Sequence, residues 1–88
     1  MFAGIRQYQT NSPDVVIRRL NREFVPLISR TEGLVAYYAI NAGDDTVVSV
    51  SVFETEAEAA ESNRCAAAWV EQSTLPIAAS SQEVMVWQ

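Results

Sequence analysis

The chain has 88 residues, so residues 1–88 read as one domain, and a domain of that size buries only a little over ~60% of the surface that its unfolded chain exposes. Hydrophobic residues make up 49% of it and charged residues only 19%, which is more apolar side chain than a small monomer readily hides, so part of it is expected to meet another chain. A formal net charge of -5, with no lysine or histidine, argues against nucleic acid and against an anionic membrane surface as partners.

The compartment predicted from the sequence is the cytoplasm. Cys65 is the single cysteine and has no partner for an internal disulfide. The start of the chain, MFAGIRQYQ, has no basic region followed by an apolar signal core, and no apolar run is long enough to span a bilayer.

The first predicted element is a strand, Phe2–Gln9. Its alternation places one set of side chains on one face, namely Phe2, Gly4, Arg6 and Tyr8, and the other set on the opposite face, namely Ala3, Ile5, Gln7 and Gln9. An arginine is costly on a buried face unless it is paired. Arg6 is therefore expected either to form a salt bridge at the rim of the sheet or to anchor an acidic substrate.

A helix is predicted to begin after Ser12, which suits the N-cap, with Pro13 and Asp14 in the first turn. An apolar stripe follows at Val16, Leu20, Phe24, Leu27 and Ile28. Pro26 lacks a backbone donor, which predicts a kink or a restart near Phe24 and Val25. Gly33 is expected to end the helix.

Two strands, Leu34–Ile40 and Thr46–Phe53, are predicted to pair as an antiparallel hairpin across the turn residues NAGDD. On the second strand three valines alternate with Val47, Ser49, Ser51 and Phe53, so neither face is charged. Tyr37 and Tyr38 must face opposite ways, and one of these phenols is expected to reach a substrate oxygen.

A second helix is predicted from the capping-box pair Thr55 and Glu58 through an alanine-rich stretch to Glu71 or Ser73. The terminal residues QEVMVWQ are predicted to form a last strand, with Val84 and Val86 on one face and Met85 and Trp87 on the other.

This order of elements is βαββαβ, an α+β ferredoxin-like fold with both helices on one face of a four-stranded antiparallel sheet. The uncovered face is expected to carry Phe53, one tyrosine of the pair at 37 and 38, and valines. Stacking two copies through that face would bury it at ~25 cal/mol per Å², which predicts a homodimer.

The run FVPLISRTEGLVAYYAINAGDDTVVSVSVFETEAEAAESNRCAAAWV resembles the antibiotic biosynthesis monooxygenase-like domains. Gly33, Tyr37, Phe53 and Glu54 carry the likeness. The resemblance implies a dimeric α+β barrel and an enzyme that uses neither metal nor flavin on phenols or quinols, since these donate an electron to oxygen themselves.

In heme-degrading members of the family, an asparagine on the first strand acts with a tryptophan and an iron-ligating histidine of the second helix. This chain offers Gln7, Gln9 and Trp69 but no histidine, so heme ligation is not expected.

Six residues form the candidate site: Asn63, Trp69, Tyr37 and Tyr38 as catalytic residues, and Arg6 and Phe53 as contacts of an aromatic or apolar substrate. Asn63 is unfavourable within a helix, which suggests a specific polar partner, although simple surface exposure also explains it. Trp69 either lines a pocket or belongs to the core or an interface.

No cofactor or metal is expected, because the acidic residues suit helix starts and the hairpin turn, and Cys65 has no histidine or lysine to activate it. Two classes of function remain open. One is a cofactor-independent monooxygenase-like enzyme, and the other is a non-catalytic dimeric module that binds a small ligand or acts as a scaffold.

Overall fold

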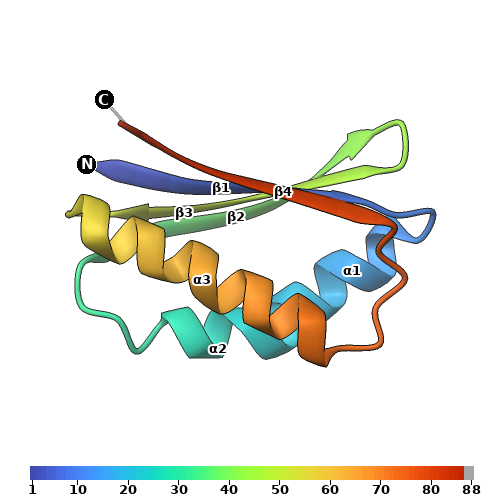
Figure 1. Ribbon diagram of the computed structural model, residues 1–88, viewed down its shortest axis with the longest axis horizontal. Coiled ribbons are helices and arrows are strands. Elements are labelled where there is room, and N and C mark those ends of the chain that lie inside the picture. Colours follow the sequence, from blue (N-terminus) through green and yellow to red (C-terminus); the bar gives the residue numbers. More distant parts are fainter. Residues whose placement is uncertain (87–88) are drawn as a thin grey trace.

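A computed structural model describes residues 1–86 and shows the predicted ferredoxin-like order of elements (Figure 1). The elements are β1 (Phe2–Gln9), α1 (Pro13–Arg19), the π-helical turn η1 (Leu20–Phe24), α2 (Val25–Ile28), β2 (Leu34–Gly43), β3 (Thr46–Phe53), α3 (Glu56–Gln72) and β4 (Ala79–Val86). None of the helices in this described part has the length and apolar character that crossing a bilayer requires.

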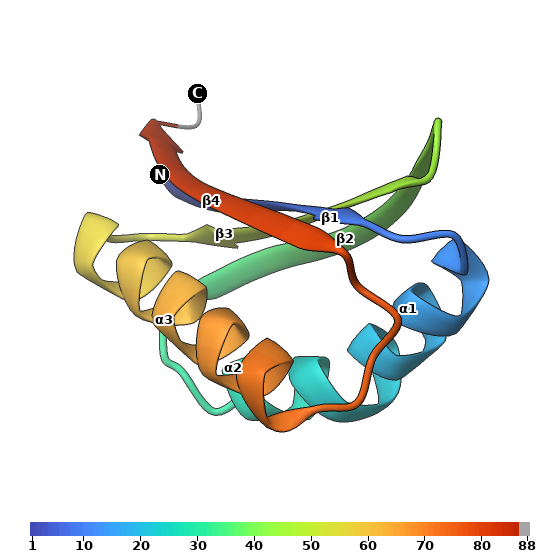
Figure 2. The same cartoon turned by 45° about the vertical axis from the view of Figure 1, so that its right-hand side comes forward.

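The four strands form one sheet in the order β2-β3-β1-β4, and every neighbouring pair is antiparallel. All the helices lie against one face of this sheet, and the other face is left uncovered (Figure 2). In the register, Arg6 lies opposite Ser49, and Tyr37 lies opposite Ser51. These side chains therefore share the helix-covered face, as the alternation along each strand requires.

Phe53 also lies on the helix-covered face, so its predicted position on the open face is wrong. It pairs with Phe2, shares the parity of Ser49 and Ser51, and is fully buried. The open face carries the opposite set, with Ile5, Tyr38, Ile40, Val48, Val50, Val52 and Met85 in register. The tyrosine of the pair that faces outward is Tyr38.

The first helix keeps its predicted start but differs in detail. Ser12 occupies the N-cap position, but its side chain makes no capping hydrogen bond to the helix, and its carbonyl accepts from the backbone of Val15 and Val16. Near Pro26 the regular α-helix is interrupted, because α1 ends at Arg19 and α-helical geometry resumes only at Val25. The π turn η1 leads directly into α2, which restarts at Val25 as predicted, while Leu27 turns outward at 46% exposure.

Other boundaries shift by a few residues. The helix ends at Ile28 rather than at Gly33, whose φ of +85° instead serves the loop that enters β2. β2 continues to Gly43, and the tight turn consists of Asp44 and Asp45, both with positive φ. β4 begins at Ala79, which is earlier than predicted, and Trp87 lies outside the described residues.

Candidate functional site

Arg6 is fully buried in the middle of β1 and points from the sheet toward α3. Its Nε donates to Ser49 Oγ at 2.8 Å, and its Nη2 donates to Ser51 Oγ at 2.6 Å. Its Nη1 donates to Asn63 Oδ1 at 3.0 Å and to Ser62 Oγ at 3.3 Å. The guanidinium is thus held by four neutral oxygens, three from serine hydroxyls and one from the amide of Asn63. We call these four residues the hydroxyl cage (Ser49, Ser51, Ser62 and Asn63).

The cage closes because α3 approaches β1 very closely at Gly4. A Cβ added to Gly4 would lie 2.8 Å from Ser62 Oγ and 2.9 Å from the backbone oxygen of Ala59, so only glycine fits there without displacement. Asn63 adds a second link, because its Nδ2 donates to the backbone oxygen of Glu83 on β4 at 2.9 Å. The predicted polar partner of Asn63 is therefore present, and the surface-exposed alternative is wrong.

No carboxylate accompanies the buried guanidinium among the described residues. The two ion pairs of residues 1–86 are Arg19 with Glu23 and Arg64 with Glu61, and neither includes Arg6. The rim salt bridge predicted as one alternative is therefore wrong. Burial lowers the pKa of Arg6 from its ordinary value, since removal from water disfavours the charged form.

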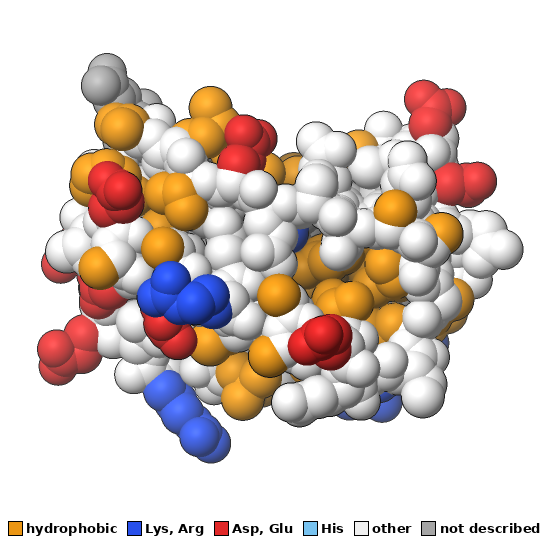
Figure 3. Space-filling model, in the orientation of Figure 1, with side chains coloured by type: hydrophobic (Ala, Val, Ile, Leu, Met, Phe, Trp, Pro, Cys, Tyr) orange, Lys and Arg blue, Asp and Glu red, His pale blue; other side chains and the backbone are white. Residues whose placement is uncertain are grey.

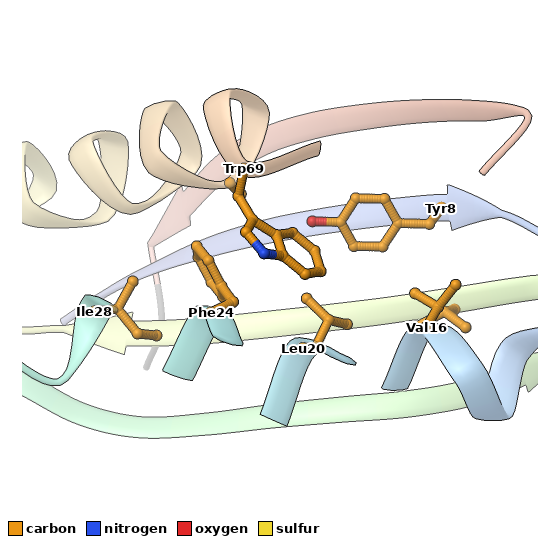
Figure 4. Close-up of a cluster of buried hydrophobic side chains, with 8 residues drawn as sticks. Tyr8, Val16, Leu20, Phe24, Ile28 and Trp69 are labelled. Carbon is orange, nitrogen blue, oxygen red and sulfur yellow. The ribbon is translucent and has the colours of Figure 1, made fainter. Parts of the chain in front are cut away.

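Two phenol groups lie close to this charge without a hydrogen-bond partner, Tyr8 on β1 and Tyr37 on β2. Burial raises the pKa of both phenols, and the charge of Arg6 opposes this effect. Both therefore stay protonated at neutral pH and can donate a hydrogen bond. Figure 4 shows the Tyr8 ring lying along β1 with its hydroxyl directed toward Trp69.

Aromatic rings lie beside Arg6 and the two phenol groups. Phe24, at the end of the π turn, lies with its ring centroid 6.1 Å from that of Tyr37 and 5.9 Å from that of Trp69. The guanidinium carbon of Arg6 lies 5.1 Å from the Phe24 centroid, within the range of a cation–π contact. Trp69 belongs to the core, as one of its two predicted alternatives states, and its Nε1 donates to Glu23 Oε1 at 3.1 Å.

Four of the six predicted site residues therefore lie in one interior region, with Arg6 hydrogen-bonded to Asn63 and with Tyr37 and Trp69 both near the ring of Phe24. Tyr38 does not join them, because it is 52% exposed on the opposite face of the sheet. Phe53 shares the covered face, but it lies at the end of β3, two residues beyond Ser51.

Sequence reasoning missed Tyr8 and the three serines of the hydroxyl cage. A signal for part of this set is present in the sequence. Ser49 and Ser51 alternate on one face of a strand that is otherwise apolar, and Arg6 and Tyr8 alternate on one face of another. Two polar pairs with the same parity indicate a buried polar cluster once the two strands are known to be neighbours.

The largest pocket described lies at one end of the sheet and has a volume of about 620 Å³. It is bounded by the turn residues Asp44 and Asp45, the end of β1, and the segment 75–78 that leads into β4. Leu75 and Ile77 of that segment also pack against the buried core. In the space-filling view, a hollow with an apolar floor opens beside this segment (Figure 3).

Within residues 1–86, no group of three or more histidine, cysteine, aspartate or glutamate side chains is arranged to hold a metal ion. Cys65 is half-buried and packs against the core. Burial, with the nearby Glu61 carboxylate, raises the pKa of its thiol, which keeps it protonated at neutral pH.

No family model matches the sequence, and no curated protein matches it. Solved structures do match the fold. A monooxygenase from the gene ActVA-Orf6 of Streptomyces coelicolor, in complex with the ligand nanaomycin D, has a TM-score of 0.76 and 14% identity over 99% of this chain and 87% of that chain. A putative antibiotic biosynthesis monooxygenase from Nitrosomonas europaea has a TM-score of 0.73 and 13% identity over 99% and 98%.

An uncharacterized NIPSNAP domain protein from Burkholderia xenovorans also matches, with a TM-score of 0.64 and 15% identity over 100% of this chain and 95% of that chain. At such identities the likeness concerns the fold. The chain is an α+β ferredoxin-like domain whose structural neighbours are antibiotic biosynthesis monooxygenase-like and NIPSNAP proteins.

Proposed function

We propose that the protein is a cofactor-independent monooxygenase-like enzyme that acts on an aromatic, quinol-type substrate between the helices and the sheet. The observation that carries this proposal is the pair of buried hydroxyls, Tyr8 and Tyr37, which have no partner beside a wall of aromatic rings. An unpaired buried hydroxyl costs about 1–3 kcal/mol, so two of them in one cluster favour a ligand that accepts their hydrogen bonds.

The chemistry places few demands on the protein. A phenol reacts with O2 to give a quinone and water: one oxygen atom bonds to a ring carbon, the other leaves as water, and the substrate supplies all the electrons. The protein must hold the ring, exclude water and stabilise charge on the substrate oxygen. In this proposal Phe24 and Trp69 hold the ring, Tyr37 and Tyr8 donate to its oxygen, and Asn63 positions Arg6.

The names of the neighbouring structures support oxygenation as the proposed class of reaction. Two of them are named as a monooxygenase with bound nanaomycin D and as a cofactor-independent oxygenase from Streptomyces nogalater. The second candidate function is a module that binds an aromatic ligand without reaction. It is favoured by the protonated state of both tyrosines, since neither can take a proton from a substrate at neutral pH.

Oxygen uptake by the purified protein tests the proposal. A panel of naphthalene and anthracene quinols and phenols is supplied, with chelator present, and consumption is followed with an electrode. Substitutions Tyr37→Phe, Asn63→Ala and Trp69→Phe are expected to reduce turnover about tenfold or more each, because each alters a group that holds the ring or its charge. Leu27→Ala, at an exposed position of α2, is the control and should retain full turnover.

The outcomes separate the two candidate functions. Turnover that falls in the three interior variants but not in the control supports the enzyme. Saturable binding of the same compounds without oxygen uptake supports the binding module. Turnover that all three folded interior variants retain would place the reaction elsewhere in the protein.

A further inference from the structure

We infer that the interior site binds its aromatic ligand as an anion, a phenolate or a carboxylate, with Arg6 as the counter-ion. This inference rests on the proposed function only for the position of the ligand. It names the chemical class of that ligand and the residue that selects it.

The first step is the charge. A buried cation is costly unless it is paired, and neutral hydrogen-bond acceptors offset only part of that cost. All four acceptors of the hydroxyl cage are neutral, and the two ion pairs of residues 1–86 are formed by other arginines. Tyr8 and Tyr37 are protonated at neutral pH and supply no negative charge. An anionic ligand would supply the missing charge.

The second step is the set of donors. Nη2 of a guanidinium carries two N–H groups, and the hydroxyl cage uses Nη2 for one bond, to Ser51. One N–H of Arg6 therefore remains, and the hydroxyls of Tyr8 and Tyr37 lie near the same charge without partners. Each phenol oxygen can also accept the remaining N–H of Arg6, but an oxyanion would accept from the guanidinium and from both hydroxyls at once.

The third step is the size of the ligand. The surroundings of these donors are aromatic, with the Phe24 ring in contact with both the guanidinium and Trp69. Rings of this kind favour an aromatic anion over a small inorganic one. The large surface pocket is a poor alternative for an anion, since Asp44 and Asp45 line it.

The experiment uses 4-nitrophenol, whose phenolate is yellow and whose ionisation is read directly from the absorption spectrum. It is titrated over pH with and without excess protein, under anaerobic conditions. The pKa of the bound nitrophenol is expected to be lower than that of the free compound. In a parallel assay, 1-naphthoate is expected to bind about tenfold or more tightly than its neutral isostere 1-naphthamide, because a charged hydrogen bond replaces a neutral one.

Three variants make the test specific. Arg6→Met removes the cation, and Asn63→Asp places a carboxylate beside it as a built-in counter-ion. Both should abolish the preference for naphthoate and the shift of nitrophenol ionisation. Arg18→Met removes the same charge from an exposed position and should change neither result. Circular dichroism establishes that each variant is folded, and Asn63→Asp keeps the test available if Arg6→Met does not fold.

Several results would overturn the inference: an unchanged or raised pKa of bound nitrophenol, equal binding of naphthoate and naphthamide, or no binding of either anion at millimolar concentration. Anion binding that depends on Arg6 but occurs without oxygen uptake would contradict the proposed enzyme and leave this inference intact. Full oxygen uptake by a folded Arg6→Met variant would contradict this inference and leave the proposed enzyme intact.

Discussion

At the scale of single residues, the unpaired hydroxyls of Tyr8 and Tyr37 connect stability with function. Each is buried with no hydrogen-bond partner and lies among the apolar side chains of the core. Such a group lowers the stability of the ligand-free fold and gains a partner only when a ligand arrives. Stability and ligand binding should therefore respond in opposite directions when these hydroxyls are removed.

Removal of either hydroxyl is expected to stabilise the ligand-free protein. Tyr8→Phe and Tyr37→Phe should each raise the free energy of unfolding by about 1 kcal/mol, because each deletes an unsatisfied buried group and keeps the ring. Urea denaturation measures this change. Leu27→Ala is the control, since Leu27 is 46% exposed on the helix layer, away from the uncovered sheet face, and its change should be near zero. A loss of stability in the first two variants would show that their hydroxyls are paired in solution.

The same tyrosines predict a pH dependence. Burial raises their pKa above the ordinary 10.0, so above about pH 10 the unfolded chain releases protons that the folded protein retains. The free energy of unfolding should therefore fall as pH rises through this range. Urea titrations between about pH 8 and pH 11 measure the slope. The slope should be smaller in the double variant Tyr8→Phe with Tyr37→Phe.

The sequence allowed part of this site to be predicted. Alternation placed Arg6 on one face of its strand, and the cost of burying it pointed to a rim salt bridge or an acidic ligand. Only the pairing of β1 with β3 shows that Ser49 lies opposite Arg6, and only the approach of α3 at Gly4 shows that Asn63 reaches it. Those contacts are made between elements distant in the sequence, so local patterns could not reveal them.

At the scale of elements, the π turn η1 decides which side chains reach the site. Buried residues recur every fourth position through the first helical segment, at Val16, Leu20, Phe24 and Ile28. A spacing of four drifts around a regular helix of ~3.6 residues per turn, and the wider π turn corrects the drift. The sequence predicted a disturbance beside Pro26 but not that a π turn would absorb it and position Phe24.

The close packing of α3 on β1 gives a prediction at this scale. Gly4→Ala should destabilise the fold by about 1–3 kcal/mol, because the added Cβ displaces α3 from the sheet. It should also weaken naphthoate binding, since Ser62 and Asn63 move with the helix. Thermal unfolding and calorimetry measure the two effects.

A second substitution controls for the cause of that destabilisation. Ser62→Ala combined with Gly4→Ala should recover only part of the loss, because the backbone oxygen of Ala59 would still lie 2.9 Å from the new Cβ. Full recovery would mean that the serine hydroxyl alone sets the distance between α3 and β1.

At the scale of the whole molecule, the uncovered sheet face is an apolar surface that nothing in the single chain covers. Ile5, Tyr38, Ile40, Val50 and Met85 lie on it, and three of these are about half exposed in the single chain. An apolar face of this kind is costly in water, and pairing with a second copy would remove it. We therefore propose a homodimer through this face.

Light scattering across a dilution series tests the dimer. The protein should have twice the monomer mass at micromolar concentration, and Ile40→Asp should shift it toward the monomer, because a charge would be buried at the interface. Leu27→Asp is the matched control, since Leu27 is 46% exposed on the helix layer and Ile40 is 50% exposed on the sheet. A folded, monodisperse monomer would rule out the proposed interface.

The overall fold followed from periodicity, because each element shows its own pattern along the chain: alternation in the strands, an apolar stripe or alanine-rich run in the helices. The assignment of Phe53 to the open face failed for a physical reason. Parity shows which residues share a face but not which face the helices cover. Ser49 and Ser51 would suit an exposed face, yet they are buried and accept hydrogen bonds from Arg6. Phe53 is buried on the same face.

A crystal structure of the protein with 1-naphthoate tests the central claim most directly. The predicted result is a carboxylate within hydrogen-bond distance of Arg6 Nη2 and of the hydroxyls of Tyr8 and Tyr37, with the naphthalene ring against Phe24 and Trp69. The segment 75–78 would then be displaced outward to admit it. Naphthoate bound only in the pocket beside Asp44 and Asp45, or on the open face of the sheet, with the interior closed, would contradict the account.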